Sequence, residues 1–241
     1  GRGVEDNHHG LVASLLAAKA LIHTGNTPTI NLGLLLVADE EPGNTYGLEH
    51  VLSQHRELFH AQDQFLVPDF GQPDSTVIEV AEKGLLWLKI TVHGQQCHAS
   101  TPDAGKNSLL AAAMCILELR ELYSFFNARD QLFDPPYSTF ESTKIEANVP
   151  NVNTIPGRDV FYCDCRVLPN YALSDVMAQV SQIADNVAEK TGQHIDIEVV
   201  HQQKSSNTPP DCPLIHNLQK AISDVYQVQA VPHGIGGGTV A

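Results

Sequence analysis

A nearly continuous apolar run, residues 29–38, constrains the fold most strongly, because it leads directly into the acidic sequence Asp39-Glu40-Glu41. An apolar run of this length is typical of a strand that is buried on both faces of a parallel sheet. A second, shorter apolar run, residues 64–68, is followed by Asp69. Open parallel sheets bind ligands at the carboxyl ends of their strands. The first part of the chain therefore predicts an open, mostly parallel α/β sheet with carboxylates at its ligand-binding edge.

Two segments with the spacing of amphipathic helices lie near these apolar runs. Apolar residues recur at helical intervals over Leu11–Ile22, which is followed by Gly25, and residues 47–58 have a similar pattern. Glycine is the commonest residue just beyond a helix end. The alternation of helix and strand supports an α/β class for this region.

The pattern changes near residue 84. Leu85–Val92 alternates between apolar and polar residues, as a half-exposed antiparallel strand does. We expect strand, helix, strand, strand, helix and strand in that order, over 85–92, 108–126, 142–149, 160–168, 173–190 and 194–200. This is the order of a ferredoxin-like α+β unit. After it, residues 202–213 are polar and contain three prolines, which indicates a linker, and 212–225 predicts a final helix. We expect a discontinuous α/β domain over 1–83 and 206–241, with a smaller α+β domain inserted over 84–205; the family resemblance given below implies that the first is the catalytic domain and the second a lid and dimerisation domain.

Composition excludes several classes of partner. The 241 residues contain 28 acids and 14 bases, for a formal net charge of −14. Nucleic acid and anionic membranes are therefore unsuitable partners, because both require a basic surface. No apolar run approaches the roughly 20 residues of a membrane-spanning helix, and no signal peptide opens the sequence. The five cysteines form no C-x-x-C pair, which indicates a reducing, cytoplasmic setting.

Acidic residues that follow predicted strands or loops are the candidate metal ligands: Asp6, the pair Glu40 and Glu41, and Asp69. Burying neighbouring carboxylates without a cation would raise their pKa values or destabilise the fold. Divalent cations accept carboxylate oxygens and would remove this conflict. The alternative is that these acids lie in solvated surface loops, and the residues alone leave both interpretations open.

Six short motifs occur in an order that resembles the M20 metallopeptidase and amidohydrolase family. The family has a G-R-G-x-x-D motif, a D-E-E block, a G-x-x-x-H-A-S-x-P block, an N-x-I-P-G block, a D-x-R block and a late G-G-T. The corresponding residues here are 1–6, 39–41, 94–102, 153–157, 164–166 and 237–239. Each motif is weak alone, but the ordered set spans nearly the whole chain. The resemblance implies a metal-dependent hydrolase of an N-acyl amino acid or a short peptide that carries a free carboxylate.

The resemblance also implies roles for the acids. Asp6 would bridge two divalent metals, Glu41 would bind one of them and Asp69 the other, and Glu40 would be the general base. Zinc is the expected metal, with cobalt or manganese as alternatives. His98 would stabilise the developing oxyanion from the partner subunit, because family members pair through their lid domains into a homodimer. Without the resemblance, His98 is a surface histidine at a strand end.

Substrate contacts are implied for four further residues. Arg166 and Asn153 resemble residues that hold the substrate carboxylate, while Gly238 and Thr239 would line the pocket. The alternatives are an ion pair between Arg166 and Asp164, an ordinary turn asparagine, and a flexible glycine loop.

The sequence departs from the family pattern at its ends. The family has an H-x-D motif before the G-R-G block and a metal-binding histidine after G-G-T, and neither occurs in these 241 residues. We expect a fragment that lacks both termini and is inactive by itself. A dipeptidase or carboxypeptidase of the same family is the close alternative function, and a non-catalytic binding or dimerising protein on the same scaffold is the more distant one.

Overall fold

The computed structural model describes residues 3–4, 6–40, 44–69 and 71–237. The chain divides into two compact units. Unit 1 comprises 1–79, 211–231 and 240–241, and unit 2 comprises 80–210 and 232–239. The three predicted domain ranges, 1–83, 84–205 and 206–241, stay a prediction about the folded protein.

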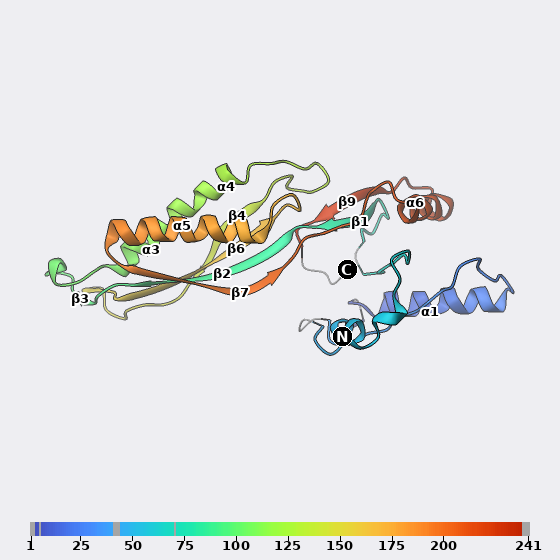
Figure 1. The fold of residues 1–241 in the computed structure, drawn as a ribbon, viewed down its shortest axis with the longest axis horizontal. Coiled ribbons are helices and arrows are strands. Elements are labelled where there is room, and N and C mark those ends of the chain that lie inside the picture. Colours follow the sequence, from blue (N-terminus) through green and yellow to red (C-terminus); the bar gives the residue numbers. More distant parts are fainter. Residues whose placement is uncertain (1–2, 5, 41–43, 70, 238–241) are drawn as a thin grey trace. The chain divides into compact units, whose positions relative to one another are not determined.

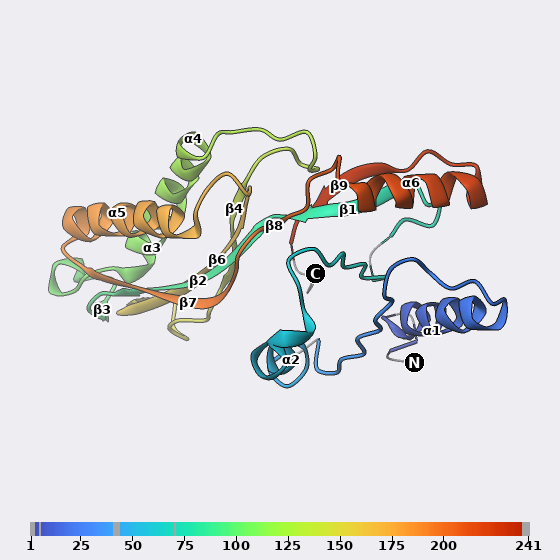
Figure 2. The same cartoon turned by 45° about the vertical axis from the view of Figure 1, so that its right-hand side comes forward.

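A four-stranded antiparallel sheet forms the centre of unit 2. Its strand order is β4-β6-β2-β7, so the first of these four strands along the chain, β2, lies between the third, β6, and the fourth, β7. The strands are β2 (Gly84–His93), β4 (Thr139–Ile145), β6 (Arg158–Val167) and β7 (His194–Gln203). Helices α3 (Ser108–Glu118) and α5 (Leu173–Thr191) cover the same face of this sheet in both views (Figures 1 and 2). This is the ferredoxin-like arrangement that the sequence predicts.

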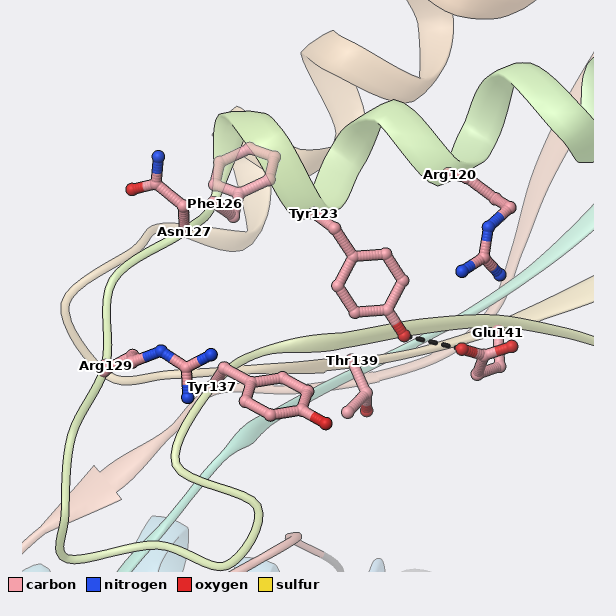
Figure 3. A pocket seen from close by; sticks show the side chains of 8 residues that line it. All are labelled: Arg120, Tyr123, Phe126, Asn127, Arg129, Tyr137, Thr139 and Glu141. Atoms are coloured by element: carbon pink, nitrogen blue, oxygen red, sulfur yellow. Dashed lines mark hydrogen bonds between the residues drawn. The ribbon is translucent and has the colours of Figure 1, made fainter.

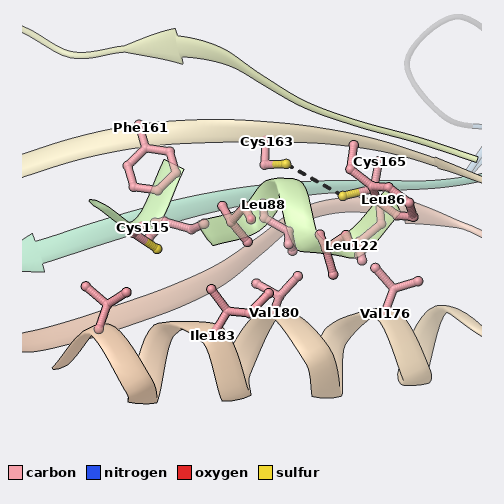
Figure 4. Packing of buried hydrophobic residues seen from close by; sticks show 14 of the residues in the cluster. Leu86, Leu88, Cys115, Leu122, Phe161, Cys163, Cys165, Val176, Val180 and Ile183 are labelled. Carbon is pink, nitrogen blue, oxygen red and sulfur yellow. Dashed lines mark hydrogen bonds between the residues drawn. The ribbon is translucent and has the colours of Figure 1, made fainter. Parts of the chain in front are cut away.

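The core of unit 2 lies between the sheet and the helices. Alternate residues of β2 are fully buried, while α5 contributes residues at intervals of three and four (Figure 4). These are Leu86, Leu88, Ile90 and Val92 from β2, and Val176, Val180, Ile183 and Val187 from α5. The two periodicities match because alternate strand residues and every third or fourth helix residue share one face. Each such side chain contributes about 1.5–3 kcal/mol when fully buried, so this core holds unit 2 together.

Short elements complete unit 2. They are β3 (Cys97–His98), η2 (Pro102–Ala104), η3 (Leu119–Glu121), α4 (Leu122–Phe125), β5 (Thr154–Ile155) and β8 (Ser206–Asn207). Strand β3 pairs with β5 in a separate two-stranded sheet. A third sheet has the order β8-β1-β9, in which β1 (Val77–Glu82) and β9 (Val231–Ile235) cross the boundary between the units.

Unit 1 contains α1 (His8–His23), α2 (Leu48–Gln54), η1 (Arg56–Leu58) and α6 (Pro213–Tyr226). The side chain of Asn7 caps α1 by accepting a hydrogen bond from the backbone N–H of Gly10. Pro213 begins α6, a position where its missing N–H costs nothing. Among the described residues, no helix has both the length and the apolar character needed to cross a bilayer.

Two predicted strands are wrong at their positions. Residues 29–38 and 64–68 form no strand, and their apolar side chains are exposed; Ile30 is 75% exposed and Phe65 61%. A strand is stabilised by hydrogen bonds to a neighbouring strand, and neither run has such a neighbour among the described residues. The apolar pattern therefore identified segments suited to burial, but burial also requires a partner.

Three further boundaries differ from the predictions. The helix predicted over 108–126 is interrupted by η3, and the one over 47–58 is interrupted at His55. The strand predicted over 142–149 runs instead from Thr139 to Ile145. It stops before Asn148, whose side chain donates to Asp159 and accepts from the N–H of Val149. Such local side-chain bonds compete with a strand ladder.

Candidate active site

The first turn of α1 lies against the segment that contains Asp69. A Cβ atom on Gly10 would lie 2.2 Å from the backbone oxygen of Pro68, so only glycine permits this approach. Asn7 and Pro68 are the immediate neighbours of Asp6 and Asp69 in the sequence. The fold of unit 1 therefore brings together the two segments that carry these predicted metal ligands. Asp6 is exposed and Asp69 is half-buried.

Glu40 lies within a turn that begins at Asp39. Asp39 has a φ of 74°, its backbone oxygen accepts from the N–H of Asn44 at 2.6 Å, and its Oδ2 accepts from the N–H of Tyr46 at 2.7 Å. Gly47 fits beside this turn because a Cβ there would lie 1.9 Å from the oxygen of Ala38. The turn leaves Glu40 on the exposed surface.

His98 and Asn153 come together in unit 2. The pairing of β3 with β5 places Cys97 opposite Ile155 and His98 opposite Thr154. The backbone N–H of Ala99 donates to the oxygen of Asn153 at 2.8 Å, and the side-chain nitrogen of Asn153 lies 3.3 Å from Nε2 of His98. Two residues predicted from different motifs thus form one exposed pair.

Arg166 fastens the glycine-rich segment near the end of the chain. Its Nη1 donates to the backbone oxygens of Gly236 at 3.2 Å and Gly237 at 2.9 Å. Its Nε and Nη2 donate to the two carboxylate oxygens of Asp164 at 2.7 and 3.1 Å. These bonds use four of the five guanidinium donors. The ion pair with Asp164, the alternative interpretation from sequence, is present.

Of the two predicted substrate residues of unit 2, Arg166 lies near the carboxyl end of β6, whereas Asn153 precedes Arg158, the first residue of that strand. Arg158 and Arg166 are separated by roughly 26 Å of strand, at about 3.3 Å per residue. Asn153 lies beyond the Arg158 end, where β3 is labelled in Figure 1. Within unit 2, Arg166 and the His98–Asn153 pair therefore do not form one site.

Comparisons with known proteins place the chain in a family. Residues 80–192 match the family model M20_dimer, described as a peptidase dimerisation domain. A metallohydrolase of Methanococcus maripaludis is 38% identical over 256 residues, which cover 100% of this chain and 62% of that protein. The chain is a member of the M20 family.

More distant relatives agree with this assignment. A succinyl-diaminopimelate desuccinylase of a Sulfurovum species is 26% identical, with coverage of 99% of this chain and 61% of the relative. The crystal structure of the aminopeptidase PepT from Bacillus cereus superposes with a TM-score of 0.76 at 19% identity, covering 98% of this chain and 58% of that one. The likeness confirms the predicted fold class, a mixed α/β protein. This M20 chain spans about three fifths of the length of the relatives it matches.

The donor chemistry of the M20 chain fits divalent metal ions. Asp6 and Asp69 supply carboxylate oxygens, which suit zinc and harder cations. Glu41 lies outside the described residues, and so do Gly238 and Thr239. Among the residues that the structure describes, no group of three or more histidines, cysteines and acids is arranged to hold a metal ion. The ligand set of Asp6, Glu41 and Asp69, with Glu40 as base, therefore stays a prediction.

Sequence reasoning missed Lys83, a buried lysine of this M20 protein. Lys83 is 2% exposed, and its Nζ donates to the backbone oxygens of Pro135 at 2.8 Å and Tyr137 at 2.7 Å. Burial lowers the pKa of the Lys83 ammonium. A Cβ on Gly237 would lie 2.3 Å from the backbone oxygen of Lys83, so this lysine also lies against the segment that Arg166 holds. The available signal was the charged pair Glu82-Lys83 within a stretch that is otherwise apolar.

Proposed function

We propose that the protein is a metal-dependent hydrolase that cleaves the amide bond of an N-acyl amino acid or of a short peptide with a free carboxylate. The observation that carries this proposal is the packing of Gly10 against Pro68, which joins the segments of Asp6 and Asp69. Membership of the M20 family and relatives named metallohydrolase and desuccinylase support it.

The proposed metal ligands are Asp6, Glu41 and Asp69, with two zinc ions, or cobalt or manganese, as the cations. Cations at such a set supply positive charge that lowers the pKa of a nearby water and stabilises negative charge on the reacting carbonyl oxygen. Glu40, adjacent to Glu41 but not a ligand, accepts a proton from the attacking water and donates it to the leaving amine. Its exposed position within the turn that begins at Asp39 leaves Glu40 accessible from solvent.

His98 is the proposed oxyanion donor. The N–H of Ser100 lies 3.2 Å from Nδ1 of His98 and can only donate to it. In the neutral ring the proton is then on Nε2, which faces Asn153 and solvent. A neutral N–H donor is the species that can stabilise a developing oxyanion, a contribution of about 3 kcal/mol. Asn153 positions this ring and is the proposed partner in substrate binding.

A homodimer through unit 2 would give the two ends of β6 separate roles. The family model that matches residues 80–192 is described as a dimerisation domain. In a pair, the His98–Asn153 end of one protomer would complete the active site of its partner, while Arg166 would serve its own protomer by holding the segment that leads to Gly238 and Thr239. We propose a reducing, cytoplasmic setting on the grounds that all five cysteines are free thiols.

The test is an assay of the complete gene product against matched substrates. N-succinyl and N-acetyl amino acids are compared with dipeptides of the same residues, before and after dialysis against a chelator and after addition of zinc, cobalt or manganese. The proposal predicts hydrolysis that the chelator abolishes and metal restores, with the acylated series preferred. Preference for dipeptides would favour the peptidase alternative. Binding without turnover of any compound would favour the non-catalytic one.

A further inference from the structure

Asp159 is a buried acid that the proposed mechanism does not use. It lies near the beginning of β6 and is 1% exposed. Burial of a carboxylate is costly unless donors bond its oxygens. Here the side-chain nitrogen of Asn148 donates to Oδ1 at 2.6 Å, and the hydroxyl of Ser108 donates to Oδ2 at 2.5 Å. One carboxylate therefore joins β6 to the segment that follows β4 and to the first turn of α3.

Ser108 connects this carboxylate to the loop 148–157, which lies between β4 and β6. Ser108 is fully buried, and its backbone N–H donates to the oxygen of Pro156 at 3.2 Å. Its hydroxyl lies 2.9 Å from the same oxygen but closer to Asp159, and a hydroxyl has only one proton to donate. The carboxylate is the stronger acceptor of the two. Asn148 at one end of the loop and Pro156 near the other are thus both fastened around Asp159.

The loop that is fastened in this way brings Asn153 to His98. The backbone N–H of Ala99 donates to the oxygen of Asn153 at 2.8 Å, and the Asn153 side chain lies 3.3 Å from Nε2 of His98. At the end of the loop, a Cβ on Gly157 would lie 2.8 Å from the backbone nitrogen of Gln96. The loop therefore lies against the segment that contains His98 at two points, so that a shift of its ends changes the position of Asn153.

The contact between Asn153 and His98 tolerates little displacement. At 3.3 Å it is already longer than most hydrogen bonds, and a separation of about 3.6 Å is no longer one. A misplacement of about 1 Å in an active site can lower a rate about a hundredfold. The loop contains only the two-residue strand β5 (Thr154–Ile155), so the position of Asn153 depends on how the ends of the loop are held.

We propose that Asp159 is a positioning residue for the His98–Asn153 pair. By bonding the start of the loop and the first turn of α3, it holds both ends of the loop, and the loop sets the distance between Asn153 and the His98 ring. This inference rests on the proposed role of His98 as the oxyanion donor, and it adds a residue that none of the six motifs contains. The position requires hydrogen-bonding atoms at two fixed places, so the shape and polarity of the side chain matter more than its charge.

Two replacements of Asp159 in the complete gene product separate hydrogen bonding from volume. Asp159→Leu removes both bonds, and we expect kcat to fall about 10–100-fold with KM changed less than about threefold, because His98 acts in the transition state. In Asp159→Asn the amide oxygen accepts from Asn148, and the amide nitrogen donates to the Ser108 hydroxyl, whose proton then goes to Pro156. We therefore expect the kcat of Asp159→Asn to remain within about threefold of that of the unmodified protein.

A double variant shows whether Asp159 acts through His98. In a His98→Ala background, Asp159→Leu is expected to lower kcat no further, because the group that it positions is absent, whereas independent effects would multiply. Ser108→Ala removes one hydroxyl–carboxylate bond with little change of volume, and it should lower kcat about threefold to tenfold. Tyr123→Phe is its matched control: the Tyr123 hydroxyl donates to Glu141 at 2.6 Å, outside the loop (Figure 3), and its loss should leave kcat unchanged.

Hydrogen exchange over residues 148–157, followed by mass spectrometry, checks the loop without relying on activity. Exchange should be faster in Ser108→Ala than in the unmodified protein and in Tyr123→Phe. Unchanged kcat in Asp159→Leu, or in Ser108→Ala where Asp159→Leu does not fold, would overturn the proposal. So would an equal fall of kcat in Asp159→Asn, an equal fall in the His98→Ala background, or unchanged loop exchange in Ser108→Ala. An unmodified protein that hydrolyses no substrate would instead contradict the proposed function, and the exchange result alone would then decide whether Asp159 holds the loop.

Discussion

The side-chain nitrogen of Asn153 lies 3.3 Å from Nε2 of His98, although 55 residues separate the two in sequence. The ladder between β3 and β5 fixes this contact, and Ser100 fixes the ring from the other side through Nδ1. Oxygen and nitrogen of an asparagine amide are assigned from the hydrogen-bond network. Because Nδ1 accepts from the Ser100 N–H, the neutral ring carries its proton on Nε2, and the amide assignment of Asn153 that suits this proton places the oxygen, rather than the nitrogen, toward Nε2.

Replacing His98 should impair turnover and spare the fold. In the complete gene product, His98→Ala is expected to lower kcat by about 10²–10³-fold with little change in KM, because an oxyanion donor acts in the transition state. Steady-state kinetics and a melting curve check this. A matched variant is His201→Ala, an exposed histidine of β7 in the same unit, which is expected to leave kcat unchanged. A loss of kcat equal in both variants would argue against a specific role for His98.

Arg166→Lys should loosen the glycine segment near the end of the chain. Lysine keeps the charge but cannot bond Asp164 with two parallel donors and also reach the oxygens of Gly236 and Gly237. We expect the free energy of unfolding to fall by about 1–2 kcal/mol and amide exchange over residues 232–237 to become faster. Arg158→Lys serves as the exposed control. Unchanged exchange in Arg166→Lys would show that the guanidinium does not hold this segment.

Lys83→Met should destabilise unit 2. The substitution retains much of the side-chain volume but leaves the backbone oxygens of Pro135 and Tyr137 without the donor that they have in the structure. A buried acceptor without a partner costs about 1–3 kcal/mol, so the melting temperature should fall. Lys204→Met, at an exposed lysine of the same unit, should change it little. Equal melting temperatures for the two variants would contradict the role assigned to Lys83.

The Asp196 carboxylate should make stability depend on pH in the acid range. Its two oxygens lie 2.8 Å from Nε2 of His93 and 2.7 Å from Nε2 of His194, and the bond to His93 is the main cause that lowers the Asp196 pKa. A carboxyl group whose pKa is lowered by folding stabilises the fold above its ordinary pKa, and that contribution disappears as the pH falls through the folded-state value. The difference in melting temperature between the unmodified chain and Asp196→Asn should therefore shrink between about pH 5 and about pH 3. A difference that stays constant over this range would contradict the expected linkage.

The sequence predicted unit 2 well because the apolar faces of its strands and helices pack against one another within the unit. The alternation in β2 and the spacing of the buried residues in α5 each specify one face, and the two faces bury each other. The runs at 29–38 and 64–68 show the opposite case, because a strand buried on both faces is apolar throughout and its sequence pattern does not indicate which strands it pairs with. Their apolar content was recognised correctly, while their strand state depends on neighbours outside the local sequence.

The candidate site was predicted residue by residue but not as an arrangement. Motif order named His98, Asn153 and Arg166, yet only the register of β3 and β5 shows that the first two touch and that the third lies at the far end of β6. The packing of Gly10 on Pro68 could not be predicted from the sequence, because a glycine can occur within a helix for several different structural reasons. Lys83 was missed because a single lysine in an apolar stretch gives no indication of the carbonyl groups it will meet.

The proposed role of Glu40 as the base in metal-dependent hydrolysis can be tested in a single experiment. The complete gene product and its Glu40→Gln variant are both loaded with zinc, and metal content is determined alongside the rate of hydrolysis of an N-acyl amino acid. Glu40→Gln removes the base but none of the proposed ligands, so the account predicts unchanged zinc content and a fall in kcat of about 10²–10⁴-fold. Full activity in the Glu40→Gln variant at equal zinc content would contradict it.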